Sequence, residues 1–182
     1  MITREKLIGA IENNLKSLNY INAFWLTGAD CLRMVDYYSD IDLWVDIATG
    51  KETETINEIK SVLEKMAKID FFFERKVSHP KIKQYILHLE GTSKFLVIDL
   101  CIQSIGKAIY YSEGELEEKP KIIFDRKNVV VSKHLNVERE SELSERKKYL
   151  INEFKVIRLD VEKEIARKEY LGVVHYLSLI HI

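Results

Sequence analysis

The chain has 182 residues, of which 46% are hydrophobic and 31% are charged, and this suits one soluble domain or one domain with a smaller appendage. A net charge of −1 argues against a nucleic-acid-binding protein, because such a surface needs a basic excess or stripe. Two cysteines without close spacing argue against a disulfide framework or a zinc cluster. With no signal segment at the start and an apolar run of only thirteen residues at the end, we expect a cytoplasmic protein that makes no membrane contact.

The first part of the chain alternates between helical and strand patterns. Apolar residues at helical spacing predict a first helix from about Thr3 to Leu18, and a second apolar stripe predicts another helix over residues 56–66. Between them, a short strand is expected in AFWLTG, ended by Gly28. The next segment, IDLWVDIA, alternates strictly, so one face of that strand is apolar and the other carries most of its polar residues.

Three strand-like runs follow the second helix, namely DFFFER, IKQYILHLE and KFLVIDLCIQ, and EGTS between the last two predicts a hairpin turn. Further on, IIFDRKNVVV fits either another short strand or an extended loop. From about residue 137 the sequence is charged and helix-favouring, which predicts one or two helices. We therefore expect an α+β fold: a mixed β-sheet flanked by helices over residues 1–130, then a C-terminal helical segment over 131–182. That segment stops in mid-pattern, and we expect it to be incomplete.

Two carboxylates stand close together where the alternating strand begins. Asp40 and Asp42 are two residues apart, so in an extended chain they share a face, with Cα atoms about 6.5–7 Å apart. Their charges repel unless a cation lies between them, and Mg²⁺ prefers oxygen ligands of this kind. The alternative is an acidic, solvated edge or turn. We expect the neighbouring Asp36 and Asp46 to be surface charges.

Asp99 interrupts FLVIDLCI, an otherwise apolar run that is typical of a central strand covered on both sides. A carboxylate buried there without a partner would be costly. Either an arginine or lysine pairs with Asp99, or Asp99 opens onto a cation site shared with the strand that begins at Asp40. Upstream, Gly28 allows the backbone to approach an anionic group, although most such glycines only make turns.

These segments together resemble the nucleotidyltransferase superfamily built around the polymerase-beta-like catalytic core. The segments are WLTGA, SDIDLWV and FLVIDLCI, and the resemblance covers roughly residues 20–105. In the family, an apolar strand ends in Gly-Ser or Gly-Gly, an Asp-x-Asp or Asp-x-Glu pair follows about ten residues later, and a third Asp lies on a later strand. SDIDLWV looks closest to small bacterial members, including the aminoglycoside and lincosamide nucleotidyltransferases.

The resemblance implies a nucleotidyltransferase core with a two-metal site. Asp40 and Asp42 would hold two Mg²⁺ ions, and Asp99 would complete the second metal site or act as base on the attacking hydroxyl. The implied nucleotide-binding residues are Gly28, Ala29, Ser39 and Arg126. One departure matters: Ala29 stands where the family has Ser or a second Gly, so a hydroxyl contact to phosphate is absent. Asp30, which follows, is expected to cap the next helix.

The resemblance further implies transfer of AMP from ATP to a hydroxyl of a small molecule, with an aminoglycoside-type antibiotic as one candidate. A homodimer could lend part of an acceptor site that the C-terminal segment leaves incomplete. Two alternatives stay open. One is a minimal nucleotidyltransferase that modifies a partner protein, as in toxin–antitoxin pairs. The other, motivated by Ala29, is a nucleotide-binding module that has lost catalysis.

Overall fold

The computed structural model describes residues 2–32, 34–112, 119–134 and 137–179. The chain divides into two compact units, residues 1–134 and 135–182. The helices and strands follow the chain in this order: α1 (Arg4–Ser17), β1 (Ile21–Leu26), α2 (Ala29–Leu32), β2 (Ile41–Ile47), α3 (Glu52–Glu64), β3 (Ile69–Arg75), β4 (Ile82–Leu89), β5 (Ile98–Gln103), β6 (Ala108–Ser112), β7 (Lys121–Asp125), β8 (Val130–His134), α4 (Val137–Arg167) and α5 (Tyr170–Leu179). No helix in the described part of the chain is long and apolar enough to cross a membrane.

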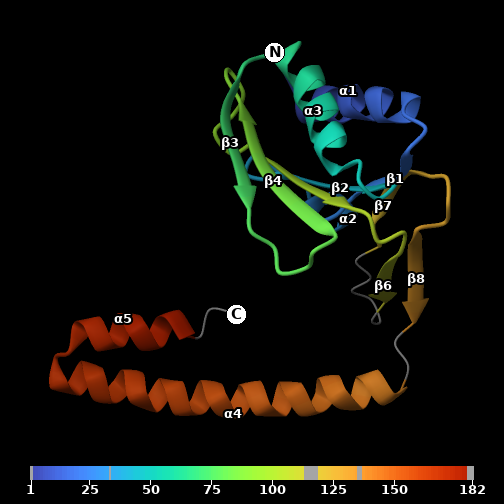
Figure 1. The fold of residues 1–182 in the computed structure, drawn as a ribbon. Helices are drawn as coiled ribbons and strands as arrows, with labels where there is room; N and C mark the ends of the chain where they lie inside the picture. The colour runs from blue at the N-terminus through green and yellow to red at the C-terminus, as the bar shows by residue number, and fades with distance from the viewer. Residues whose placement is uncertain (1, 33, 113–118, 135–136, 180–182) are drawn as a thin grey trace. The chain divides into compact units, whose positions relative to one another are not determined.

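The first unit is built on a mixed sheet of six strands in the order β3-β4-β5-β2-β1-β7 (Figure 1). Only β2 and β5 run parallel, and every other neighbouring pair in this sheet is antiparallel. Helices α1 and α3 cover one face of the sheet (Figure 1). The class expected from the sequence, α+β with a mixed sheet followed by a helical segment, is confirmed at this level.

The main hydrophobic core lies between the sheet and these two helices. It follows the predicted periodicities: α1 buries Leu7, Ile11 and Leu15 at helical spacing, and β2 buries alternate residues from Ile41 to Ile47. Thr3 caps the start of α1 by accepting a hydrogen bond from the backbone N–H of Lys6. The first helix predicted from the sequence is therefore confirmed within a residue or two at each end.

The opposite face of the sheet is covered in part by a second, two-stranded sheet in which β6 and β8 run parallel. A small cluster of Ala23, Trp25 and Val129 lies under it, and Trp44 and Tyr110 pack against that cluster. The segment IIFDRKNVVV, expected as one strand or a loop, forms β7 and β8 with a turn between them. The carboxylate of Asp125 organises this turn by accepting hydrogen bonds from three backbone N–H groups.

The second unit consists of α4 and α5, which pack against each other. The prediction of one or two closing helices is confirmed. Their side chains include many exposed apolar residues, for example Phe154, Leu159, Leu171 and Val174. The chain leaves α4 at Lys168, which takes a positive φ of 63° before α5 begins.

Candidate functional site: paired carboxylates on the open face of the sheet

Two aspartates meet on neighbouring strands at the centre of the sheet. In the parallel pair of β2 and β5, Asp42 lies directly opposite Asp99. Residues in this relation project from the same face of the sheet. That face is the one not covered by α1 and α3, because the alternate residues of β2 fill the helix-covered core. The expected adjacency of the two strands is confirmed, and the like charges of Asp42 and Asp99 lie side by side.

The electrostatics of Asp42 reflect this crowding. Burial of the carboxyl, followed by the charges of Asp40 and Asp99, raises the pKa of Asp42 from 3.8 to about 6. Arg4 opposes this shift without cancelling it. Asp40 is the residue just before β2, and it is exposed. Its backbone carbonyl accepts a hydrogen bond of 2.6 Å from the Arg4 guanidinium. The carboxylates of Asp40 and Asp99 therefore both act on the charge of Asp42.

Asp99 has partners of its own. The side-chain amide of Gln84 donates to both carboxylate oxygens, at 2.8 and 2.9 Å, and an Nη atom of Arg75 lies 3.6 Å from one of them. The carboxylate of Asp99 keeps about 20% of its surface exposed. Both alternatives considered from the sequence thus apply in part: Asp99 faces an arginine, and it also opens toward Asp42. Any cation bound at this position must share Asp99 with Gln84 and Arg75.

Gly28 lies against the carboxylate of Asp42. Its φ is +60°, a conformation that residues with a side chain adopt rarely. A Cβ atom at this position would lie 2.0 Å from Oδ2 of Asp42, so no other residue fits without a shift. The turn is fixed to β2 by the Thr27 N–H, which donates to the backbone carbonyl of Asp42 at 3.1 Å. The glycine therefore brings the backbone of the turn directly beside the acidic pair.

The neighbouring residues of the turn have other partners. Ala29 begins the short helix α2, and its carbonyl accepts from the Met34 N–H. Asp30 does not act as the expected cap: its nearly buried carboxylate pairs with Arg4, and the Lys121 ammonium lies 3.6 Å away. Arg4 therefore joins the turn after β1 to the start of β2. Nothing in the sequence marks this role, because Arg4 opens a helix far away along the chain.

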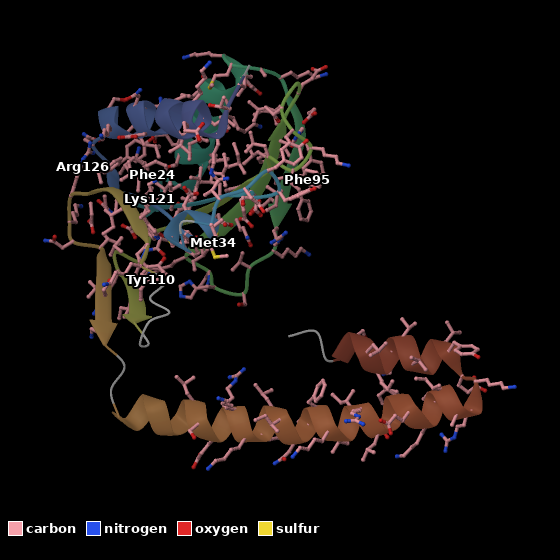
Figure 2. All side chains as sticks on the ribbon, turned by 180° about the vertical axis from the view of Figure 1, so that it is seen from behind. Phe24, Met34, Phe95, Tyr110, Lys121 and Arg126 are labelled. Atoms are coloured by element: carbon pink, nitrogen blue, oxygen red, sulfur yellow. The ribbon has the colours of Figure 1, made fainter. Side chains whose placement is uncertain are left out.

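The hydroxyl of Ser39 is engaged within the turn before β2. It donates to the carboxylate of Asp36 at 2.8 Å and accepts from the Asp36 backbone N–H. The bond from the Ser39 hydroxyl, followed by one from the Tyr38 backbone N–H, lowers the pKa of the Asp36 carboxyl. Asp36 is exposed, as expected of a surface charge. Beside this turn, Tyr37 and Tyr38 pack edge-on against Phe95, which is labelled in Figure 2.

Arg126 lies away from the carboxylates. Its guanidinium donates to the backbone carbonyls of Lys16, Leu18 and Ile21, at and just beyond the end of α1 (Figure 2). Strand β7 pairs with β1 so that Lys121 is opposite Leu26, near Gly28, whereas Arg126 follows β7 at the other end of β1. The structure therefore places Arg126 at a helix terminus and Lys121 at the acidic turn.

The expectation that Asp46 is a surface charge is wrong. Its carboxylate is fully buried and accepts hydrogen bonds from the side-chain amides of Asn22 and Gln103 and from the Gly106 backbone N–H, all within 2.9 Å. The chain leading into β6 covers this end of β2, and the sequence alternation does not reveal that cover. Trp44, between Asp42 and Asp46, stacks on Trp25, whose indole N–H donates to the hydroxyl of Tyr110.

The donor set at Asp42 and Asp99 fits a hard divalent cation in its chemistry. All three candidate ligands, Asp40, Asp42 and Asp99, are carboxylates, and the charges of Asp40 and Asp99 act together with burial to raise the pKa of Asp42. Among the described residues, no three histidine, cysteine or carboxylate side chains are already arranged as a complete ligand set. Cys101, two residues beyond Asp99 in β5 and on the same face, remains a thiol, because burial and the nearby Asp99 and Asp42 raise its pKa to about 12.

Comparisons with known proteins give little further guidance. No family model matches this chain, and no curated protein matches it either. Among solved structures, it is similar to the JHP933 protein from Helicobacter pylori, with 16% sequence identity and a TM-score of 0.35. The match covers 74% of this chain and 51% of that one, so the chain spans about half of its length. A TM-score this low assigns neither a fold nor a function.

Proposed function

We propose that this protein is a Mg²⁺-dependent nucleotidyltransferase of the polymerase-beta-like type, which transfers AMP from ATP to a hydroxyl group of a small molecule. One observation carries the proposal: Asp42 and Asp99 face each other on adjacent parallel strands, with Asp40 two residues upstream. Burial and the charges of Asp40 and Asp99 disfavour the ionised form of Asp42, and a bound cation would stabilise it. The glycine turn against Asp42 supports the same conclusion.

Asp40, Asp42 and Asp99 are the residues that would hold the metal. When bound, Mg²⁺ supplies charge neutralisation for the triphosphate and for the oxygens that attack and leave. Because Gly28 has no side chain, the carboxylate of Asp42 lies directly against the backbone of the turn, and phosphate oxygens on a metal held by Asp42 would lie beside that backbone. The side chains of Lys121 and Arg4 supply positive charge beside the same turn, although Asp30 already pairs with both.

The proposed reaction is an in-line displacement at the α-phosphorus of ATP. The acceptor oxygen forms the new bond to phosphorus, the bond to the bridging oxygen breaks, and pyrophosphate leaves with its electron pair. The acceptor hydroxyl must lose its proton, and a carboxylate oxygen of Asp99, opposite Asp42 on the open face, would accept it. The Gln84 amide and Arg75 orient Asp99 for this task.

A nucleotide-binding module without catalysis is the second candidate, and two observations favour it. Ala29 lacks the hydroxyl that the resembled family offers to phosphate. In addition, both oxygens of Asp99 already accept hydrogen bonds from Gln84. Such a module would bind ATP with Mg²⁺ through Asp42 and the glycine turn but would release no product.

Turnover separates the two candidates. Purified protein is incubated with each of the four nucleoside triphosphates, a panel of small hydroxyl acceptors including aminoglycosides, and either Mg²⁺ or EDTA. Pyrophosphate release is then followed by a coupled assay. The enzyme predicts release that requires both Mg²⁺ and an acceptor, with ATP preferred. It also predicts a loss of at least about 100-fold in Asp42→Asn and in Asp99→Asn.

Glu64→Gln is the matched control, because Glu64 is exposed at the end of α3 on the helix-covered side of the sheet. It should retain the wild-type rate. ATP binding without pyrophosphate release, together with unchanged behaviour of Asp99→Asn, would favour the binding module. Absence of both ATP binding and turnover would remove both candidates.

A further inference from the structure

Strand β3 forms a free edge of the six-stranded sheet, and no other described strand pairs with its outer side (Figure 1). It carries three consecutive phenylalanines, and Phe71, Phe72 and Phe73 are exposed by 52%, 42% and 51%. Soluble proteins normally blunt such edges with charge, proline or cover, because an apolar edge is a template for pairing with another chain. The exposed, apolar edge of β3 therefore favours pairing with a further strand, the occupant of this edge.

The regular part of this edge is short and symmetric. The register between β3 and β4 shifts between Ile69 and Phe71, which marks a bulge at Asp70. From Phe71 to Arg75 the pairing is continuous, and Phe73 is the centre of these residues. The side chains of Phe71, Phe73 and Arg75 share one face of the sheet, and those of Phe72 and Glu74 share the other.

We propose that the occupant is a second copy of this chain, whose β3 pairs antiparallel with the first about a two-fold axis through Phe73. In this isologous pairing Phe73 faces Phe73 of the second copy, Phe71 faces Arg75, and Phe72 faces Glu74. The two six-stranded sheets become one continuous sheet. Because the axis is perpendicular to the sheet, the acidic pairs of both copies open on the same side.

The charges of the edge complement each other in this register. On the open face, each Arg75 guanidinium meets the ring of Phe71 from the other copy, a cation–π pair that occurs twice. On the helix-covered face, Lys60 already lies over the ring of Phe72, with its ammonium 4.4 Å from the ring centre. Glu74 of the second copy, which faces Phe72, therefore approaches a lysine. Within its own chain Glu74 already pairs with Lys83 at 3.3 Å, and Arg75 lies 3.6 Å from Asp99. The proposed register adds the contacts across the edge to these, and it sets no charged residue of the paired segment opposite a like charge.

Neighbouring symmetric registers lack this fit. A pairing centred on Phe72 sets Asp70 opposite Glu74, and like charges directly opposite one another destabilise a strand pair. A pairing centred on Phe71 runs into the bulge at Asp70, whose carboxylate is already bonded to Nδ1 of His88 at 2.7 Å. Pairing at β3 is a matter of assembly that goes beyond the proposed function, and it stands whether or not the protein transfers nucleotides.

Cysteine cross-linking tests the register directly. Residues opposite each other on antiparallel strands have Cβ atoms about 4.5–5.5 Å apart, near the separation that a disulfide requires. Full-length Phe73→Cys is oxidised under mild conditions, and covalent dimer is quantified on non-reducing gels. We expect it to form at least about tenfold faster than in Phe72→Cys, which faces Glu74, because pairing sets a high effective concentration only for position 73.

Ile122→Cys is the matched control at the opposite edge of the sheet, because Ile122 in β7 is 49% exposed. The wild type reports any background from Cys31 and Cys101. Light scattering over a concentration series supplies a second measurement: wild type should reach the mass of a dimer, and Phe73→Asp should stay monomeric. Monomeric wild type, a dimer that survives Phe73→Asp, or equal cross-linking at positions 73, 72 and 122 would each overturn the proposal.

Discussion

Asp42 is the residue at which the electrostatic cost of the site is concentrated. Its pKa in the folded protein, about 6, lies above the unfolded value of 3.8, because burial and the charges of Asp40 and Asp99 disfavour the carboxylate. A carboxyl group whose pKa is higher in the folded than in the unfolded protein contributes most to stability at a pH where it is protonated in both. That contribution is present below about pH 4 and is lost as the pH rises through about 6.

Replacing Asp42 with asparagine should therefore stabilise the protein at neutral pH. In EDTA at pH 7.5, we expect Asp42→Asn to unfold at a higher temperature, with a gain of about 1–2 kcal/mol, because it removes a charge that burial and the charges of Asp40 and Asp99 disfavour. The gain should vanish near pH 4, where the wild-type carboxyl is protonated. Thermal unfolding from pH 4 to 8 measures the gain, and a gain that does not depend on pH would contradict the ionised Asp42 carboxylate as its cause. Added Mg²⁺ should stabilise the wild type more than the variant.

Gly28 and Gly50 form a natural pair for a second test. Both have positive φ, +60° and +84°, but a Cβ atom at Gly28 would strike Asp42, whereas one at Gly50 meets nothing within 4 Å. We expect Gly50→Ala to cost about 1 kcal/mol of stability through backbone strain alone. Gly28→Ala should cost more and should also weaken ATP binding, measured by calorimetry. Equal effects of the two substitutions on binding would show that the turn does not serve the site.

At the scale of helices and strands, the sequence predicted most of the first unit. Strict alternation in IDLWVDIA and the apolar run around Asp99 were enough to place β2 and β5, and their pairing brings Asp42 opposite Asp99. Helical spacing likewise placed α1 and α3. These features are local, so a single stretch of sequence contains the pattern that determines them.

Other features depend on partners distant in the sequence. Alternation showed which side of β2 carries Asp46, but not that the chain near Gly106 buries that side. Strand β6 and its pairing with β8 were not predicted. The role of Arg4, which joins the glycine turn to β2, was not predicted either. Arg126 was implied as a nucleotide-binding residue by the family resemblance, and its three carbonyl partners lie more than 100 residues earlier in the chain, where no local pattern reveals them.

Arg126 gives a prediction about the end of α1. Arg126→Ala removes the donor of three backbone carbonyls at and beyond the last turn of the helix, so we expect a loss of about 1–3 kcal/mol of unfolding free energy. Urea denaturation measures this loss. Binding of ATP should be unchanged at temperatures where the variant is folded. Weaker nucleotide binding in a folded Arg126→Ala protein would return this residue to the candidate site.

At the scale of the whole molecule, the chain consists of two compact units with separate packing. The main core and the paired carboxylates all lie within residues 1–134. We therefore expect residues 1–134, produced alone, to unfold in one cooperative thermal transition and to retain Mg²⁺-dependent ATP binding. Circular dichroism and calorimetry measure these two properties. A fragment that lacks a cooperative transition would show that the first unit depends on residues 135–182 for its stability.

The proposed function requires Asp42 and Asp99 to hold a divalent cation together with a nucleotide. Mn²⁺ takes the same oxygen ligands as Mg²⁺, and its free form is measured directly by electron paramagnetic resonance. With ATP present, we expect wild type to withdraw more Mn²⁺ from solution than ATP alone does, and Asp42→Asn and Asp99→Asn to lose at least about tenfold in affinity. Equal Mn²⁺ binding by wild type and both variants, or none by wild type, would contradict a metal site at Asp42 and Asp99.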